Sequence, residues 1–92
     1  MTLFAVDYTY RTETAGLRDV HRPAHRTWLR EQHEAGVVRL SGPFEDQSGA
    51  LIVIEAEDRT ALDAVLAQDP FAVNGAVDGV RVKPWNVVFG SL

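Results

Sequence analysis

His25 is the residue of this sequence that is best placed to do chemistry. It lies in the segment HRPAHRTWL, residues 21–29, and helical spacing puts it on the same stripe as Trp28 and Leu29. An imidazole changes its charge between about pH 5 and 8, so an inward histidine can take up and return protons. A lone histidine on an apolar stripe is more often a core residue whose ring nitrogens are hydrogen-bonded. On its own, His25 leaves both interpretations open.

Asp69 is the second candidate, and it shifts this balance. It follows Leu62 by seven residues and Leu66 by three, which places it on the inward stripe of a predicted second helix. At the C-terminus of that helix the macrodipole disfavours a carboxylate, so the position costs stability. The alternative is a local role, since an aspartate before a proline can begin a turn by accepting backbone N–H groups ahead of it. An inward carboxylate that accepts one ring N–H of His25 would leave the other ring nitrogen free to take a proton from a substrate.

Other combinations of residues are less specific. His21 and His25 have the i,i+4 spacing of a metal-binding pair, but Pro23 suits the first helical turn and would place His21 at or before the helix start. Ser41 could complete a Ser-His-Asp set, yet no nucleophile-elbow motif surrounds it. Lining a pocket or capping the turn at 42–43 is the better interpretation of this serine. We therefore expect no metal and no cofactor.

Six elements are predicted to position these residues, and periodicity and turn residues define them. In chain order they are a strand over residues 3–10, a helix over 23–35, strands over 37–43 and 50–57, a helix from Thr60 to about Asp69, and a strand over 80–89. The Thr60 and Asp63 pair has the spacing of a capping box. The β-α-β-β-α-β order predicts an α+β ferredoxin-like fold, with two helices on one face of a four-stranded antiparallel sheet. The whole chain, residues 1–92, is expected to form a single domain.

The third predicted strand carries information about partners. Residues 50–54, ALIVI, offer apolar side chains to both faces of the sheet, as strands that are covered on both sides do. The helices cover one face, and we expect no other part of the chain to cover the second. A second copy of the chain is the expected cover, which predicts a homodimer with its sheets packed face to face. The alternative is a far face that tolerates a few scattered apolar residues.

Composition sets the broad class of the protein. Hydrophobic residues make up 46% of the chain and charged residues 24%, which is an ordinary globular balance. The net charge is −4 and the nine basic residues are scattered, which argues against a nucleic-acid partner. There is no cysteine, no basic leader before the first strand, and no stretch near the ~20 apolar residues of a membrane span. We expect a cytoplasmic protein with no membrane partner.

Taken in order, three stretches resemble the YCII-related domain family: HRPAHRTWLREQHEAGVVRLSGP, GALIVIEAEDRTALDAVLAQDPF and GVRVKPW. They match that family's R-P-A-H helix, its A/S-G-P turn, its D-P-F/Y after the second helix and its late K-P-W/F, and they cover nearly the whole chain. The resemblance implies a dimeric α/β barrel, related in architecture to muconolactone isomerases, with His25 and Asp69 as the active-site pair. One family member is a dehydrochlorinase acting on a chlorinated hydroxyhydroquinone, while most have no assigned reaction. The loop at 44–48 is shorter than in some relatives, which changes the rim of the pocket.

The sequence thus predicts an enzyme that carries out metal-independent elimination or isomerisation of a small polar, cyclic compound. His25 would act as the general base and Asp69 would orient it. Ser41 would hydrogen-bond the substrate, and Arg22 would hold an anionic group near the helix start. The alternative is a non-catalytic homodimer that binds a small metabolite or serves as an accessory subunit. An open cavity that reaches the imidazole would favour the enzyme, and a sealed pair would favour the alternative.

Overall fold

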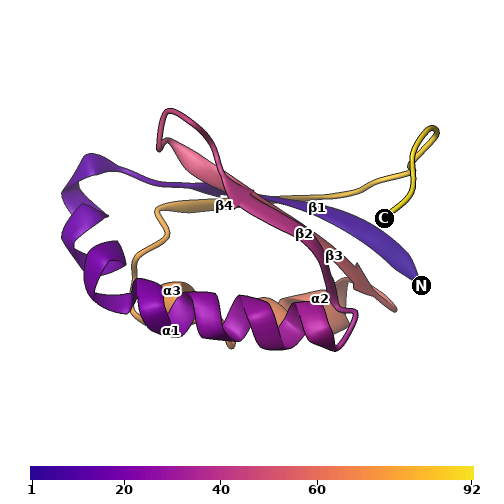
Figure 1. Ribbon diagram of the computed structural model, residues 1–92, viewed down its shortest axis with the longest axis horizontal. Coiled ribbons are helices and arrows are strands. Elements are labelled where there is room, and N and C mark those ends of the chain that lie inside the picture. Colours follow the sequence, from indigo (N-terminus) through magenta and orange to yellow (C-terminus); the bar gives the residue numbers. More distant parts are fainter.

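The computed structural model describes residues 1–92 and contains one four-stranded antiparallel sheet (Figure 1). The strands are β1 (Thr2–Thr9), β2 (Val38–Pro43), β3 (Gly49–Ala56) and β4 (Gly79–Pro84). Their order across the sheet is β2-β3-β1-β4, which is the predicted ferredoxin-like arrangement. The last strand ends at Pro84, short of the predicted residue 89. Its partner β1 begins at Thr2, and the N–H of Trp85 already donates to the backbone oxygen of Leu3 at 2.8 Å, so β1 offers almost no further strand to pair with.

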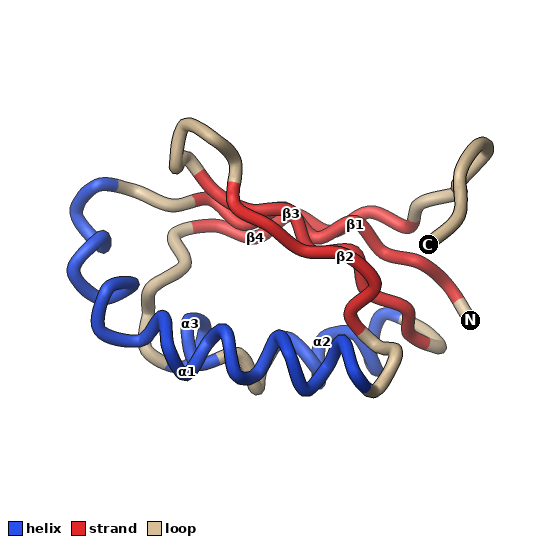
Figure 2. Tube along the Cα trace, in the orientation of Figure 1, coloured by secondary structure: helices blue, strands red, loops and turns tan.

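All helices lie on one face of the sheet, so the molecule has two layers (Figure 2). A short 3₁₀ helix, η1 (Thr12–Thr14), leads into α1 (Ala15–Glu34), and α2 (Arg59–Leu66) and α3 (Pro70–Val73) follow β3. The C-terminal segment runs on the side of the sheet away from the helices (Figure 1). None of the helices is long and apolar enough to cross a membrane. The predicted α+β class is confirmed, with a third, short helix added after the second.

The start of α1 differs from the prediction. The helix begins at Ala15, and Pro23, the predicted start, lies inside it. An interior proline removes one helical hydrogen bond, so other contacts must hold the turns before it. Arg18 makes such contacts, because its buried guanidinium donates to the backbone oxygens of Arg11 at 2.7 Å and Ala76 at 3.0 Å. The prediction missed these turns because nothing near Pro23 in the sequence indicates contacts so far away.

The bounds of α2 also differ from those predicted. Asp58, and not Thr60, is the N-cap, and its side chain accepts the backbone N–H of Ala61 at 2.8 Å. Aspartate is among the best N-cap residues because its short side chain reaches the unpaired N–H groups of the first turn. The helix ends at Leu66, short of the predicted end. The region that follows is therefore free to form a separate element.

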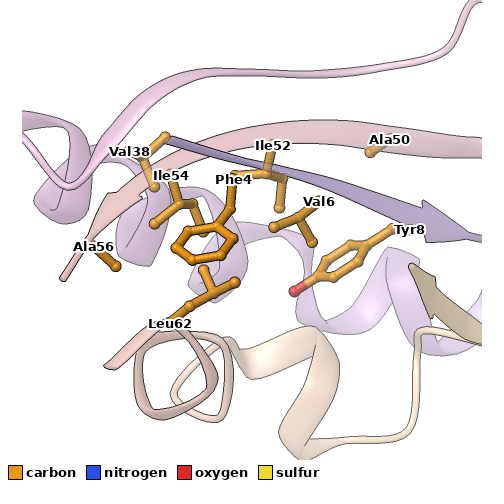
Figure 3. Packing of buried hydrophobic residues seen from close by; sticks show 9 residues of the cluster. All are labelled: Phe4, Val6, Tyr8, Val38, Ala50, Ile52, Ile54, Ala56 and Leu62. Carbon is orange, nitrogen blue, oxygen red and sulfur yellow. The ribbon is translucent and has the colours of Figure 1, made fainter. Parts of the chain in front are cut away.

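The hydrophobic core lies between the sheet and the helix layer. Alternate residues of β1 pair with alternate residues of β3, so both central strands turn one face toward the helices. Nine buried residues form the resulting cluster (Figure 3): Phe4, Val6, Tyr8, Val38, Ala50, Ile52, Ile54, Ala56 and Leu62. Each fully buried large apolar side chain contributes roughly 1.5 to 3 kcal/mol, so this cluster is the main source of stability. Its polar member is Tyr8, whose hydroxyl points toward the helix layer (Figure 3).

The second face of the sheet is partly covered by the chain itself. Val53 is only 1% exposed although it points away from the helices, while Leu51 on the same face is 38% exposed. Trp85 lines the same hollow as Val53, so this indole supplies part of the cover. The expectation that no other part of the chain covers this face is therefore wrong. Leu40, Leu51 and Trp85 nevertheless remain exposed, which leaves an apolar patch.

Candidate active site

His25 and Asp69 meet in the structure. His25 comes from α1 and Asp69 from the loop before α3, and Nδ1 of the imidazole lies 2.6 Å from Oδ1 of the carboxylate. His25 is 7% exposed and Asp69 is 0% exposed, so little water competes for this contact. A hydrogen bond to an ionised carboxylate is shorter and stronger than one between neutral groups. The two residues singled out by the sequence thus form one buried pair.

Asp69 reaches this position as the N-cap of α3 and does not end α2. Its backbone is extended, Pro70 occupies the first turn, and Oδ1 accepts the backbone N–H of Phe71 at 2.9 Å. The predicted conflict with a helix macrodipole is therefore wrong, because the carboxylate lies at a helix start and not at a helix end. The alternative role, an aspartate that begins a turn by accepting N–H groups ahead of it, is present in the structure.

The hydrogen bonds that the Asp69 carboxylate accepts determine which ring nitrogen of His25 carries the hydrogen. The hydroxyl of Tyr8 donates to Oδ2 at 2.8 Å, and the N–H of Phe71 donates to Oδ1. An ionised carboxylate only accepts, so the contact with His25 is satisfied when Nδ1 carries its hydrogen. Nε2 is then the nitrogen with the free lone pair. Burial and the neighbouring Asp69 charge raise the pKa of Tyr8, so this phenol remains a donor.

Aromatic rings fix the plane of the imidazole. The Phe71 ring is parallel to that of His25, with centroids 3.8 Å apart and an interplanar angle of 2°. Trp28, nearly one turn along α1, stacks on the imidazole at 6.2 Å and 30°. The short helix α3 thus supplies the stacking ring, and the residue that caps it supplies the carboxylate. An imidazole held by its edge and its face loses little further freedom when it transfers a proton.

His25 opens onto a small cavity between α1 and the β2 side of the sheet. The cavity has a volume of about 100 Å³, and its polar lining comes from Tyr10, Arg22, His25, Arg26 and Ser41. Nε2 of His25 makes no hydrogen bond within the protein. Nε1 of Trp28 is the only side-chain nitrogen or oxygen that is both inaccessible to solvent and without a hydrogen-bond partner. Since Nε2 of His25 has no partner, it must be accessible. The cavity therefore reaches the imidazole.

The two predicted substrate-binding residues also lie at this cavity. Ser41 of β2 pairs with Ile52 of β3 on the helix-facing side of the sheet and lines the cavity. Arg22 lines it as well, and its guanidinium donates to Asp19 at 2.8 Å. The structure brings these side chains to the same space as His25, and their action on a substrate stays a prediction.

His21 lies inside α1, one turn before His25, because the helix begins earlier than predicted. The argument that Pro23 separates the two histidines is therefore wrong, since both belong to the same helix. Nδ1 of His25 is nevertheless bound to Asp69. No group of three or more histidine, cysteine, aspartate or glutamate side chains lies close enough to hold a metal ion.

Tyr10 borders both the cavity and the buried guanidinium of Arg18. The Arg18 guanidinium carbon lies 4.4 Å from the centroid of the Tyr10 ring, which is a cation–π contact. Burial, with the charge of Asp69, raises the pKa of Tyr10 to about 12, and the charges of Arg18 and Arg22 oppose that rise. The Tyr10 hydroxyl makes no hydrogen bond within the protein, so it is available to a molecule in the cavity.

Sequence reasoning does not identify four residues of this site, namely Tyr8, Tyr10, Arg26 and Phe71. The two tyrosines carry a usable signal, because they share the inward face of the first strand by alternation. The bond from Tyr8 to Asp69 carries none, since 61 positions separate the two residues and no local pattern joins them.

Comparison with known proteins identifies the family and the fold of this chain. A family model describing the YCII-related domain matches residues 2–86. The chain belongs to the YCII-related domain family. The 5-chloro-2-hydroxyhydroquinone dehydrochlorinase from Burkholderia phenoliruptrix AC1100, solved in complex with 2,5-dihydroxybenzoquinone, resembles it with a TM-score of 0.78 and 22% identity, over 91% of this chain and 93% of that chain.

A second solved structure, an antibiotic biosynthesis monooxygenase, resembles this YCII-related protein with a TM-score of 0.59 and 18% identity. The alignment covers 96% of this chain and 99% of that chain. No curated protein is similar enough in sequence to match. At these identities the two likenesses establish the fold alone, which is ferredoxin-like.

Proposed function

We propose that this YCII-related protein is a small-molecule enzyme in which His25 and Asp69 act as an acid–base pair. The observation that carries the proposal is the environment of the imidazole: Nδ1 is bound to Asp69 at 2.6 Å, Nε2 has no partner within the protein, and His25 lines the cavity. A general base needs this arrangement, because the carboxylate fixes the tautomer and the second nitrogen takes the proton. The likeness to a dehydrochlorinase supports the same conclusion.

The reaction we propose is metal-independent elimination or isomerisation of a small polar, cyclic compound. In an elimination, Nε2 of His25 removes a proton from the substrate, the electron pair of that bond forms a new π bond, and a group such as chloride leaves with its own electron pair. In an isomerisation, the same proton returns from Nε2 to a different substrate carbon. In both, the carboxylate of Asp69 stabilises the imidazolium that forms.

The neighbouring side chains bind the substrate in this proposal. Ser41 hydrogen-bonds it from β2, and Arg22 faces a negatively charged group from α1. Phe71 and Leu29 supply apolar contact to its ring from the same cavity lining. The site therefore combines a few directed polar groups with apolar walls, as sites for small molecules commonly do.

The test compares His25→Gln with His33→Gln. His33 is a matched control because it belongs to the same helix but is exposed, and its Nδ1 donates to the backbone oxygen of Val38 at 2.8 Å away from the cavity. Chlorinated hydroxyhydroquinones and lactones are offered to each protein, and chloride release and ultraviolet spectra are followed. We expect His25→Gln to lose about 100-fold or more in rate, and His33→Gln to keep the wild-type rate.

Two results would contradict the proposal. Equal rates in wild type and His25→Gln would show that His25 is not the general base. If no compound is turned over, and 2,5-dihydroxybenzoquinone leaves the ring signals of His25 unshifted in NMR spectra, the pair is a buried polar contact in a non-catalytic protein.

We also propose that two copies pair through the far face of the sheet. The patch left exposed there contains Leu40, Leu51 and Trp85, which are 52%, 38% and 42% exposed. Large apolar side chains gathered on one face of a small domain favour association, because burial removes them from water. A two-fold arrangement lets the same patch serve both copies.

A further inference from the structure

The mouth of the candidate active site carries an excess of positive charge. A wider hollow of about 530 Å³ adjoins the inner cavity and shares Tyr10, Arg22 and Arg26 with it. Arg18 and Asp19 also line this hollow, so three arginines face a single aspartate. The chain as a whole has a net charge of −4, so the positive mouth is a local feature. Such a region raises the local concentration of anions.

The three arginines differ in how much of their charge is available. Arg18 is buried, and its guanidinium lies 3.5 Å from the carboxylate of Asp78. Arg22 is bound to Asp19 at 2.8 Å. Arg26 is exposed and makes no ion pair or hydrogen bond within the protein. It is therefore the cation at the mouth with all its donors free.

The inner cavity limits the size of what can bind. Its volume of about 100 Å³ is smaller than the ~150 Å³ of an engineered cavity that holds benzene. A single ring therefore enters only in part, and its substituents lie in the outer hollow. Arg26 directly follows His25 in α1 and lines both hollows, so a ring whose reacting atom lies at the imidazole places its substituents in the space that Arg26 borders.

We infer that the ligands of this site are single-ring anions with the charge on ring substituents, and that Arg26 selects for that charge. The inference rests on the proposed function only in taking the cavity beside His25 as the binding site. A guanidinium offers five donors in a planar fork, which matches paired oxygens such as those of a carboxylate or a hydroxyquinone anion. The field of Arg22 adds to the attraction, and the free Tyr10 hydroxyl is a further donor.

Arg26→Gln and Arg30→Gln form a matched pair of variants for the test. Arg30 lies one turn further along α1, is exposed, has no partner, and lines neither hollow. The probes are 2,5-dihydroxybenzoquinone, whose two acidic hydroxyl groups make it an anion at neutral pH, and its uncharged dimethyl ether. Calorimetry measures the affinity, and the NMR ring signals of His25 report whether each probe enters the cavity.

Wild type should bind the anion about tenfold or more tightly than the neutral ether, with the His25 signals shifted. Arg26→Gln should bind the anion about tenfold more weakly and the ether unchanged, because one charge-assisted contact is lost. Arg30→Gln should match wild type. If Arg26→Gln keeps full affinity while the His25 signals still shift, or if both probes bind wild type equally, the inference fails and the proposed function stands. If neither probe shifts the His25 signals, the inference fails. The proposed function fails with it only when the turnover assay also finds no reaction.

Discussion

Asp69→Asn should lower the melting temperature, because the carboxylate holds the fold as well as the imidazole. It is fully buried and accepts bonds from Tyr8, His25 and Phe71. An amide keeps the shape but offers one oxygen, so at the other position an NH₂ group faces a donor. Asparagine caps a helix about as well as aspartate does, so the bond from Phe71 is kept. The bonds from Tyr8 and His25 each lose their charge assistance at a cost of about 1 kcal/mol, so the total loss is about 2 kcal/mol. In a domain of this size that loss lowers the melting temperature by about 8 to 16 °C.

Thermal unfolding followed by circular dichroism at neutral pH measures this change, with Asp58→Asn as the matched control. Asp58 is also an N-cap aspartate, but it is exposed and accepts a single backbone N–H, from Ala61. Asparagine caps a helix about as well as aspartate does, so the control should shift by less than about 2 °C.

A melting temperature for Asp69→Asn that is unchanged or higher would refute this reasoning. That outcome is what the sequence-based argument predicts, because it places the carboxylate at the negative end of a helix, where removing the charge stabilises. If the melting temperature falls equally in both variants, the loss of stability comes from helix capping alone. The bonds to His25 and Tyr8 then make no measurable contribution to stability.

Three further outcomes follow from the structure. The free energy of unfolding should fall as the pH rises above about 10. Tyrosines of the unfolded chain lose their protons there, whereas the raised pKa values of Tyr8 and Tyr10 keep the protons on the folded chain. Urea titrations at rising pH measure the fall, and Tyr8→Phe should make it smaller. Leu51→Asp should convert the proposed dimer to monomer or aggregate, and light scattering that finds the wild type monomeric at micromolar concentration would contradict the dimer. Elemental analysis of protein purified without added metal should find no stoichiometric transition metal, and a zinc or iron ion held by His25 would overturn its role as a base.

The sheet and its core could be predicted from the sequence because they depend on local periodicity. Alternation along β1 identifies the face that carries Phe4, Val6 and Tyr8, and the strand pairing repeats that pattern on β3. Gly42-Pro43 likewise marks the end of β2. These features need only nearest neighbours along the chain, so the order of elements and the sheet topology agree with the prediction.

The site could be predicted only in part, because the residues that contact one another there come from distant segments of the chain. The inward position of His25 follows from helical spacing, but the turns of α1 before Pro23 depend on the long-range bonds of Arg18. The sequence predicts Asp69 at the wrong helix end, because no glycine or proline directly after Leu66 marks the end of α2. Tyr8 reaches Asp69 only once the sheet and the helix layer have packed.

The shared oxygen of Asp69 makes the backbone of α3 a reporter of the imidazole. Oδ1 accepts both the ring N–H of His25 and the amide N–H of Phe71, at 2.6 and 2.9 Å. Exchange of the Phe71 amide hydrogen with solvent deuterium requires that its bond to this oxygen open, so its protection factor reports on the oxygen that also holds the imidazole. An event that alters the charge on His25, such as proton transfer to Nε2, alters the strength of both bonds. The hydrogen exchange of one backbone amide can therefore report proton transfer at His25.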